Sequence, residues 1–183
     1  MSARALWPLL LVAGAGLSAW QWHEAADGTA SHGGHTHLHD DAGKPARLYA
    51  WDAAQATHVT LATPAASVTL TRAGQGWAAM PEGAAGGFDA AQFLALFSQA
   101  RSDRALAPHA DQPYGLSPPQ LRIDIRDATG VRLAQMEVGA LAPDGLGRYV
   151  QLPGEAQIRI IPDYQTRAPM AAMVQVNPHA EIP

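Results

Sequence analysis

The sequence predicts an α+β fold in which the sheet is antiparallel. Segments that alternate between apolar and polar residues come in two groups, and a helical pattern follows each group. His58–Ala62 and Ser67–Thr71 open the first group, and Leu121–Arg126 opens the second. Strands and helices do not alternate one by one, as parallel βαβ units require, so we expect antiparallel β-meanders with two short helices. The two groups also suggest a loosely duplicated strand-strand-strand-helix unit.

The first group ends in a helix that has a clear start. The residues from Ala73 to Gly76 are typical of a hairpin turn, and Gly76–Met80 is predicted to be the third strand, with Trp77 in the core. Asp89 is a favourable N-cap for a helix that we expect to run to about Ala100. Its apolar face is predicted to consist of Phe93, Leu94, Leu96 and Phe97. An irregular, proline-containing connection is expected after it.

The second group has the same kinds of signal. We expect strands over residues 131–138, 147–152 and 157–161, with turns at 127–130 and at Pro153-Gly154 between them. A short helix is predicted from about Asp163 to Met173. The sequence therefore divides into residues 1–22, a linker of residues 23–46, an α+β domain of residues 47–173 and an irregular tail of residues 174–183.

The N-terminal segment is predicted to anchor the chain in a membrane. The residues from Ala5 to Trp22 include no ionisable side chain, and as a helix they would be about 27 Å long, close to the hydrocarbon thickness of a bilayer. Arg4 precedes the segment and Glu24 follows it, so the positive-inside rule places the remainder of the chain outside the cytoplasm. The alternative is a cleaved signal peptide. Both interpretations place the folded part in the periplasm, and the first tethers it to the bacterial inner membrane.

Histidines and acidic residues are concentrated in the linker that follows. The potential metal ligands are His23, His32, His35, His37, His39, Asp40 and Asp41. Glycine, serine, threonine and alanine make up most of the remainder, so we expect a disordered tether. In an extended conformation His35, His37 and His39 project to one side, and neutral imidazoles beside carboxylates suit Zn²⁺ or Cu²⁺. The tract is predicted to capture a divalent metal, with a solubilising or pH-responsive linker as the alternatives.

Composition excludes several classes of function. The chain of 183 residues has a formal net charge of −4 and no basic cluster, so nucleic acid is not an expected partner. It contains no cysteine, which excludes disulfides, thiolate nucleophiles and cysteine-bound zinc. No phosphate-binding glycine loop or nucleophile motif is present. We therefore expect a non-enzymatic protein without an established cofactor.

Several short patterns in the predicted domain resemble one bacterial family. They are Gly76-Trp77, the helix led by Asp89, Tyr114-Gly115-Leu116 with Pro118-Pro119, Val138-Gly139, Gly147-Arg148-Tyr149-Val150 and the strand Ile158–Ile161 before a helix. In this order and spacing they resemble the family known as domain of unknown function 4340, over roughly residues 48–173. The resemblance implies an exported, membrane-tethered protein associated with envelope components, and it implies no catalytic residues.

These observations predict an accessory or scaffold domain of a cell-envelope assembly. It would be anchored by residues 5–22, face the periplasm and bind a protein partner, for which an edge strand is one possible site. The alternative is a periplasmic Zn²⁺ or Cu²⁺ buffer or metallochaperone that acts through the histidine-rich tract.

Overall fold

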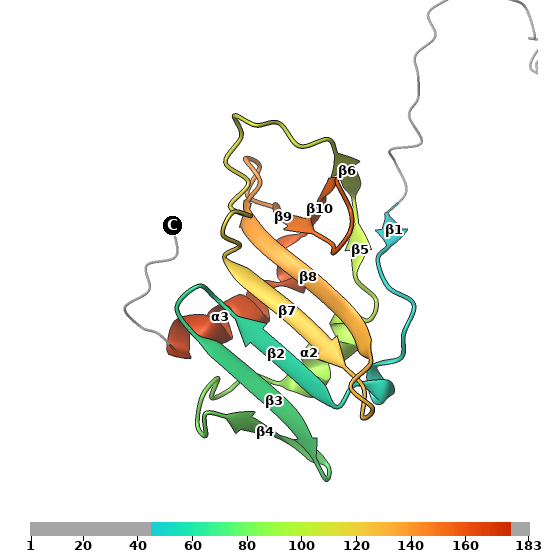
Figure 1. Cartoon of the computed structure of the whole chain (residues 1–183), viewed down its shortest axis with the longest axis vertical. Coiled ribbons are helices and arrows are strands. Elements are labelled where there is room, and N and C mark those ends of the chain that lie inside the picture. The colour runs from blue at the N-terminus through green and yellow to red at the C-terminus, as the bar shows by residue number, and fades with distance from the viewer. Residues whose placement is uncertain (1–44, 177–183) are drawn as a thin grey trace, which may run out of the picture. The chain divides into compact units, whose positions relative to one another are not determined.

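The structure, a computed structural model, describes residues 45–176 and confirms an α+β fold with antiparallel sheets and two α-helices (Figure 1). The predicted anchor, the seven potential metal ligands and the end of the tail lie outside the described residues. Within residues 45–176, no helix is both long and apolar enough to cross a membrane.

One eight-stranded sheet dominates the fold, in the order β4-β3-β2-β7-β8-β9-β10-β6. Its strands are β2 His58–Ala62, β3 Ser67–Ala73, β4 Gly76–Met80, β6 Arg104–Leu106, β7 Leu121–Arg126, β8 Arg132–Leu141, β9 Gly147–Gln151 and β10 Ile158–Pro162. A two-stranded sheet pairs β1 Ala46–Arg47 with β5 Arg101–Ser102. The helices are α2 Ala90–Phe97 and α3 Arg167–Val176, with the 3₁₀ turns η2 Ala53–Gln55 and η3 Asp163–Gln165.

The two predicted groups of strands form one continuous sheet. β2, β3 and β4 form one meander and β7 to β10 form another, and the first strands of the two meanders, β2 and β7, pair with each other, with Val59 opposite Ile125. Each meander is followed by its helix, and both helices pack on the same face of the sheet (Figure 1). The core therefore lies between one face of the sheet and the pair of helices.

Alternation in the strands separates this core from a polar face. In β7, Leu121, Ile123 and Ile125 are fully buried beneath the helices. The intervening Asp124 lies on the opposite face, where it forms ion pairs with Arg126 at 2.7 Å and with Arg132 at 2.8 Å. This face is the one turned toward the viewer in Figure 1, and no helix among the described residues covers it.

The first helix starts as predicted but is shorter. The carboxylate of Asp89 accepts a hydrogen bond from the backbone N–H of Gln92 at 2.9 Å and so caps α2. The helix ends at Phe97, not near Ala100, because the chain enters β5 at Arg101. Phe93, Leu94 and Phe97 are buried, but the prediction for Leu96 was wrong, since 39% of this residue is exposed.

Other parts of the prediction also need correction. The connection after α2 contains β5 and β6, and β6 reaches the sheet by pairing with β10. The last predicted helix is two elements, η3 and α3, and α3 runs to Val176. Trp77, predicted as a core residue, is half-buried and only borders the core. Of the two tryptophans within residues 45–176, Trp51 is the buried one, with 9% of the residue exposed.

A second, smaller core lies on the opposite face of the sheet, at its β9–β10 end. The loop through Tyr114 crosses this face, and the ring of Tyr114 meets that of Tyr149 edge to face at 4.9 Å. Gly139 makes this approach possible, because a Cβ at this position would lie well inside 3.0 Å of the carbonyl oxygen of Tyr114. The backbone N–H of Ala140 donates to the same carbonyl at 2.8 Å. The two patterns Tyr114-Gly115-Leu116 and Val138-Gly139 are therefore the two sides of one backbone contact.

Candidate functional site

The described residues do not bring together a metal site. No group of three or more histidine or acidic side chains within residues 45–176 is placed to hold an ion. The imidazole of His109, in the loop before Tyr114, is exposed. His58 lies on β2, where its Nδ1 atom is 2.9 Å from the hydroxyl of Thr57. The predicted metal ligands His23 to Asp41 all precede the described part, so metal capture by the tract stays a prediction.

One hollow of about 470 Å³ lies beside the smaller core. Its lining combines Arg104, His109 and Asp144 with the edge-to-face pair Tyr114 and Tyr149. The carboxylate of Asp144 accepts hydrogen bonds from the backbone N–H groups of Leu146 at 2.9 Å and Gly147 at 3.1 Å. These bonds, helped by the charge of Arg104, hold the pKa of the Asp144 carboxyl below its usual value. Asp144 therefore stays ionised and fastens the turn between β8 and β9, which is a structural task.

A second carboxylate with a lowered pKa has a similar task. Asp127 accepts hydrogen bonds from the hydroxyl of Thr129 at 2.8 Å and from the backbone N–H groups of Thr129 and Val131, both at 2.9 Å. The Thr129 hydroxyl is the main reason that the pKa of Asp127 is lowered. This carboxylate stabilises the predicted turn between β7 and β8. Neither acid has the raised pKa that a general acid needs near neutral pH.

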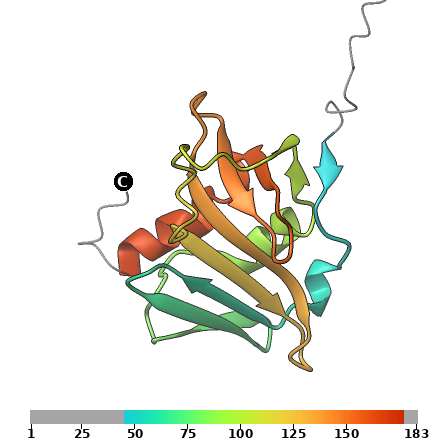
Figure 2. The same ribbon diagram turned by 45° about the horizontal axis from the view of Figure 1, so that its top comes forward.

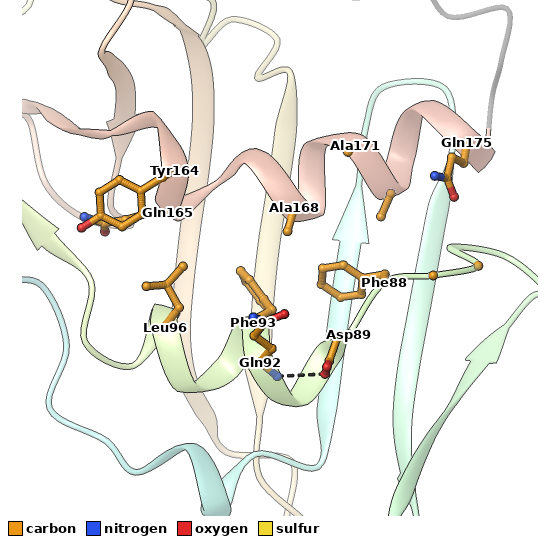
Figure 3. A pocket seen from close by; sticks show the side chains of 13 residues that line it. Phe88, Asp89, Gln92, Phe93, Leu96, Tyr164, Gln165, Ala168, Ala171 and Gln175 are labelled. Carbon is orange, nitrogen blue, oxygen red and sulfur yellow. Dashed lines mark hydrogen bonds between the residues drawn. The ribbon is translucent and has the colours of Figure 1, made fainter.

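A groove lies between α2 and α3 of the described domain (Figure 3). Its volume is about 520 Å³. Phe88, Phe93 and Leu96 line it from the α2 side, and Tyr164 lies at one end (Figure 3). On the α3 side it is lined by Ala168, Ala171 and Ala172. The amide-bearing residues of the whole lining are Gln92, Gln165 and Gln175.

The lining of this groove is apolar and almost uncharged. Leu96 is 39% exposed and Tyr164 is 56% exposed, so two large side chains border the groove in contact with solvent. Phe93 is buried beneath them and packs against Phe88 with ring centroids 5.4 Å apart. Asp89 is the one ionisable carboxylate in the lining, and its oxygen already caps α2. The groove can therefore accept an apolar group, but it holds no side chain arranged to transfer a proton or to act as a nucleophile.

The periodicity of each helix could not reveal this groove. Leu96 fits the apolar pattern of α2 as well as Phe93 and Phe97 do, and the alanines of α3 occur in an alanine-rich sequence. The groove forms because two helices that are about 70 residues apart in the sequence lie side by side on the sheet (Figure 1). Leu96 and the alanines of α3 can be recognised as the two sides of one groove only when the positions of both helices are known.

The free edge of the sheet at β4 is the second candidate surface. Among the described residues β4 pairs with β3 alone, so its other side presents unpaired backbone groups. Gly76, Ala78 and Met80 are exposed, and Met80 is 75% exposed. Figure 2 shows β4 at the border of the sheet, next to β3. The fold therefore has a free sheet edge at β4, and a binding site on an edge strand stays a prediction.

Comparison with known proteins finds no family model, no curated protein and no solved structure that matches this chain.

Proposed function

We propose that this chain is a non-enzymatic accessory or scaffold domain of a bacterial cell-envelope assembly. Residues 5–22 would hold it in the inner membrane, and the α+β domain would face the periplasm and bind a protein partner. The apolar anchor sequence and the resemblance to the family known as domain of unknown function 4340 support the location. The exposed apolar groove between α2 and α3 is the observation that carries the binding role.

The chemistry of the groove suggests the kind of partner. An apolar floor between two helices accepts the apolar face of a third helix, and small side chains such as Ala168 and Ala171 allow its backbone to approach closely. Leu96 and Tyr164 would then be covered, which removes exposed apolar area from water. The only charged side chain in the lining, Asp89, already caps α2, so we infer an amphipathic partner helix that inserts leucine-like or aromatic side chains.

Photo-crosslinking from the groove tests this role. A benzoylphenylalanine placed at Leu96 in the full chain is expected to give one discrete adduct in envelope membranes. The substitution Ala171→Glu should abolish that adduct, because it places a carboxylate in the apolar groove. Ala171 is exposed at the surface of α3, so this variant should fold normally.

The matched controls use Ala95, which is exposed on α2 but does not line the groove. The photoreactive residue at position 95 should give little of the adduct, and Ala95→Glu should leave the Leu96 adduct unchanged. If positions 95 and 96 form the same adducts equally, or if Ala171→Glu has no effect, the groove is not the binding site.

The histidine-rich tract supports a second candidate function, the capture of Zn²⁺ or Cu²⁺ by His32, His35, His37 and His39. Calorimetric titration of the exported part, with and without residues 23–45, tests it. Metal handling requires stoichiometric binding with a dissociation constant of about 1 μM or tighter, and this binding must disappear with the tract. Millimolar binding would contradict metal handling. The adduct at Leu96 should form in both cases, so the two functions can be separated.

We also propose that the two halves of the domain derive from an ancient duplication. Each half is a β-meander followed by a helix, and the equivalent first strands β2 and β7 are neighbours in the interior of the sheet. An antiparallel pair of equivalent strands is what a two-fold relation between the halves would produce. The second meander has four strands and the first has three, so β10 has no counterpart in the first half, and β6 belongs to the connection between the halves.

A further inference from the structure

The free edge of β4 has backbone groups whose direction follows from its hairpin. Gly74 and Gln75 are the two loop residues between β3 and β4, so Ala73 and Gly76 are the closing pair. In such a hairpin the closing pair is hydrogen-bonded, and bonded and non-bonded pairs then alternate. Gly76, Ala78 and Met80 therefore direct their N–H and C=O groups toward β3. Trp77 and Ala79 direct theirs away from the sheet, where no backbone group of the described residues bonds to them.

We infer that this edge pairs with the same edge of a second copy of this chain, antiparallel and with a two-fold axis at Ala78. With that register Trp77 lies opposite Ala79 of the second copy, and Ala79 lies opposite its Trp77. The backbone N–H and C=O groups of Trp77 and Ala79 point away from β3, so each opposite pair exchanges two N–H···O=C hydrogen bonds. The register therefore forms four hydrogen bonds in all. The result is one continuous antiparallel sheet through both copies.

The side chains suit this register. Ala78 would lie opposite Ala78 of the second copy in a non-hydrogen-bonded pair. In such a pair the Cα atoms are only about 4.5 Å apart, and small side chains fit best. On the helix side, the large ring of Trp77 would lie over the small Ala79 of the other copy. Trp77 is half-buried, and the guanidinium of Arg72 lies 5.0 Å from its ring centroid. A second copy would cover more of this indole and of Ala79, which is also half-buried.

The edge also has little protection against such pairing. Sheet edges are commonly blocked by charged residues, prolines or bulges, and β4 has none of these within its five residues. Pro81 follows at once and limits the pairing to this short strand. The contact is much smaller than a standard interface of about 1,600 Å², so the dimer is weak in dilute solution. Two chains held in one membrane have a raised effective concentration, which favours the dimer.

Cysteine crosslinking of the full chain tests the register directly, because the natural sequence contains no cysteine. At the two-fold axis, Ala78→Cys would place two cysteines opposite each other. Their Cα atoms would lie within the separation of about 4.4–6.8 Å that a disulfide requires. The chain, purified in mild detergent, is oxidised with oxidised glutathione instead of a copper catalyst, so that the histidine tract does not interfere. Disulfide-linked dimer is measured on non-reducing gels.

Met80→Cys is the matched control, because Met80 is exposed on the same strand and the same face as Ala78. In the inferred register the two copies of position 80 are about 13 Å apart along the strand. We expect Ala78→Cys to crosslink at least ~10-fold faster than Met80→Cys at equal protein concentration. Adding Gln75→Lys at the hairpin tip should leave this rate unchanged. Equal rates at positions 78 and 80, or a faster rate at 80, would overturn the inference.

Discussion

Phe97→Ala is expected to lower the free energy of unfolding by about 3–5 kcal/mol, the usual cost of deleting a buried phenyl ring. Phe97 is fully buried at the end of α2. Its ring packs against Phe93 with centroids 5.0 Å apart and against Tyr49 with centroids 5.5 Å apart. Truncation would leave a cavity that joins the helix, the sheet and the segment around Tyr49. Urea denaturation of the chain, followed by circular dichroism, measures the loss.

Leu96→Ala is the control for this prediction, since it removes an apolar side chain from the next position of the same helix. Leu96 is 39% exposed, so its truncation should change the unfolding free energy by less than about 1 kcal/mol. The same variant should weaken the adduct formed from the groove by a photoreactive group at another lining position. If Leu96→Ala destabilises the chain as strongly as Phe97→Ala, then Leu96 is part of the core and the groove is not an open surface.

Arg148→Ala is expected to cost about 2–3 kcal/mol, because it leaves largely buried acceptors without their donor; the carboxylate of Asp163 keeps its second ion pair, with Arg167 at 3.0 Å. Only 11% of the side chain of Arg148 and 13% of that of Asp163 are exposed. The guanidinium donates to Asp163 at 3.0 Å, to the carbonyl oxygen of Gly139 at 3.0 Å and to the amide oxygen of Gln120 at 3.2 Å. Arg148 therefore joins β9 to the bulged part of β8 and to η3.

Arg122→Ala removes a salt bridge that has good geometry but is exposed. Arg122 lies 2.7 Å from Glu137 on the polar face of the sheet, and half of its side chain is exposed. This substitution should cost no more than about 1 kcal/mol. Denaturant midpoints of the two variants compare the two pairs directly. If the two variants lose equal amounts of unfolding free energy, the structural role of Arg148 is contradicted. A midpoint of Arg148→Ala close to that of the unmodified chain would contradict it more strongly.

The groove and the β4 edge share no residues, so the two surfaces can be tested separately. Ala171→Glu should abolish the helix-partner adduct and leave the crosslinking of Ala78→Cys intact. Conversely, a chain that fails to form the β4 pair should keep the groove adduct. A membrane-tethered scaffold that dimerises through its sheet edge would present two grooves, and such an arrangement strengthens binding to a partner that has two helices.

Local patterns predicted the regular elements well. The bounds of β2, β4 and β7 agree with the predicted segments, and Asp89 caps α2 as expected. Alternation also identified the buried residues of β7, because one side of each strand must face the core. These features depend on neighbouring residues, which is why the sequence contains the information directly.

Features that depend on distant residues were missed. β6 has three residues and exists only because β10 is available to pair with it. Leu96 matched the helical pattern but lies beside the groove, since α3 does not cover that side of α2. Arg148 lies in the predicted strand 147–152, where no local pattern indicates burial, yet it is one of the least exposed charged side chains in the described salt bridges. No local rule distinguishes these residues from their neighbours.

The sequence by itself determined the α+β class, the strands of both meanders, the cap of α2 and the expectation of an anchor followed by a histidine-rich tract. It could do so because periodicity, capping and composition are properties of short segments. Only the tertiary structure decided that both meanders share one sheet, that α2 and α3 leave an apolar groove, and that the uncharged strand β4 forms its edge. Those outcomes arise from packing between segments far apart in the chain, where the position of each residue depends on which surface its element meets.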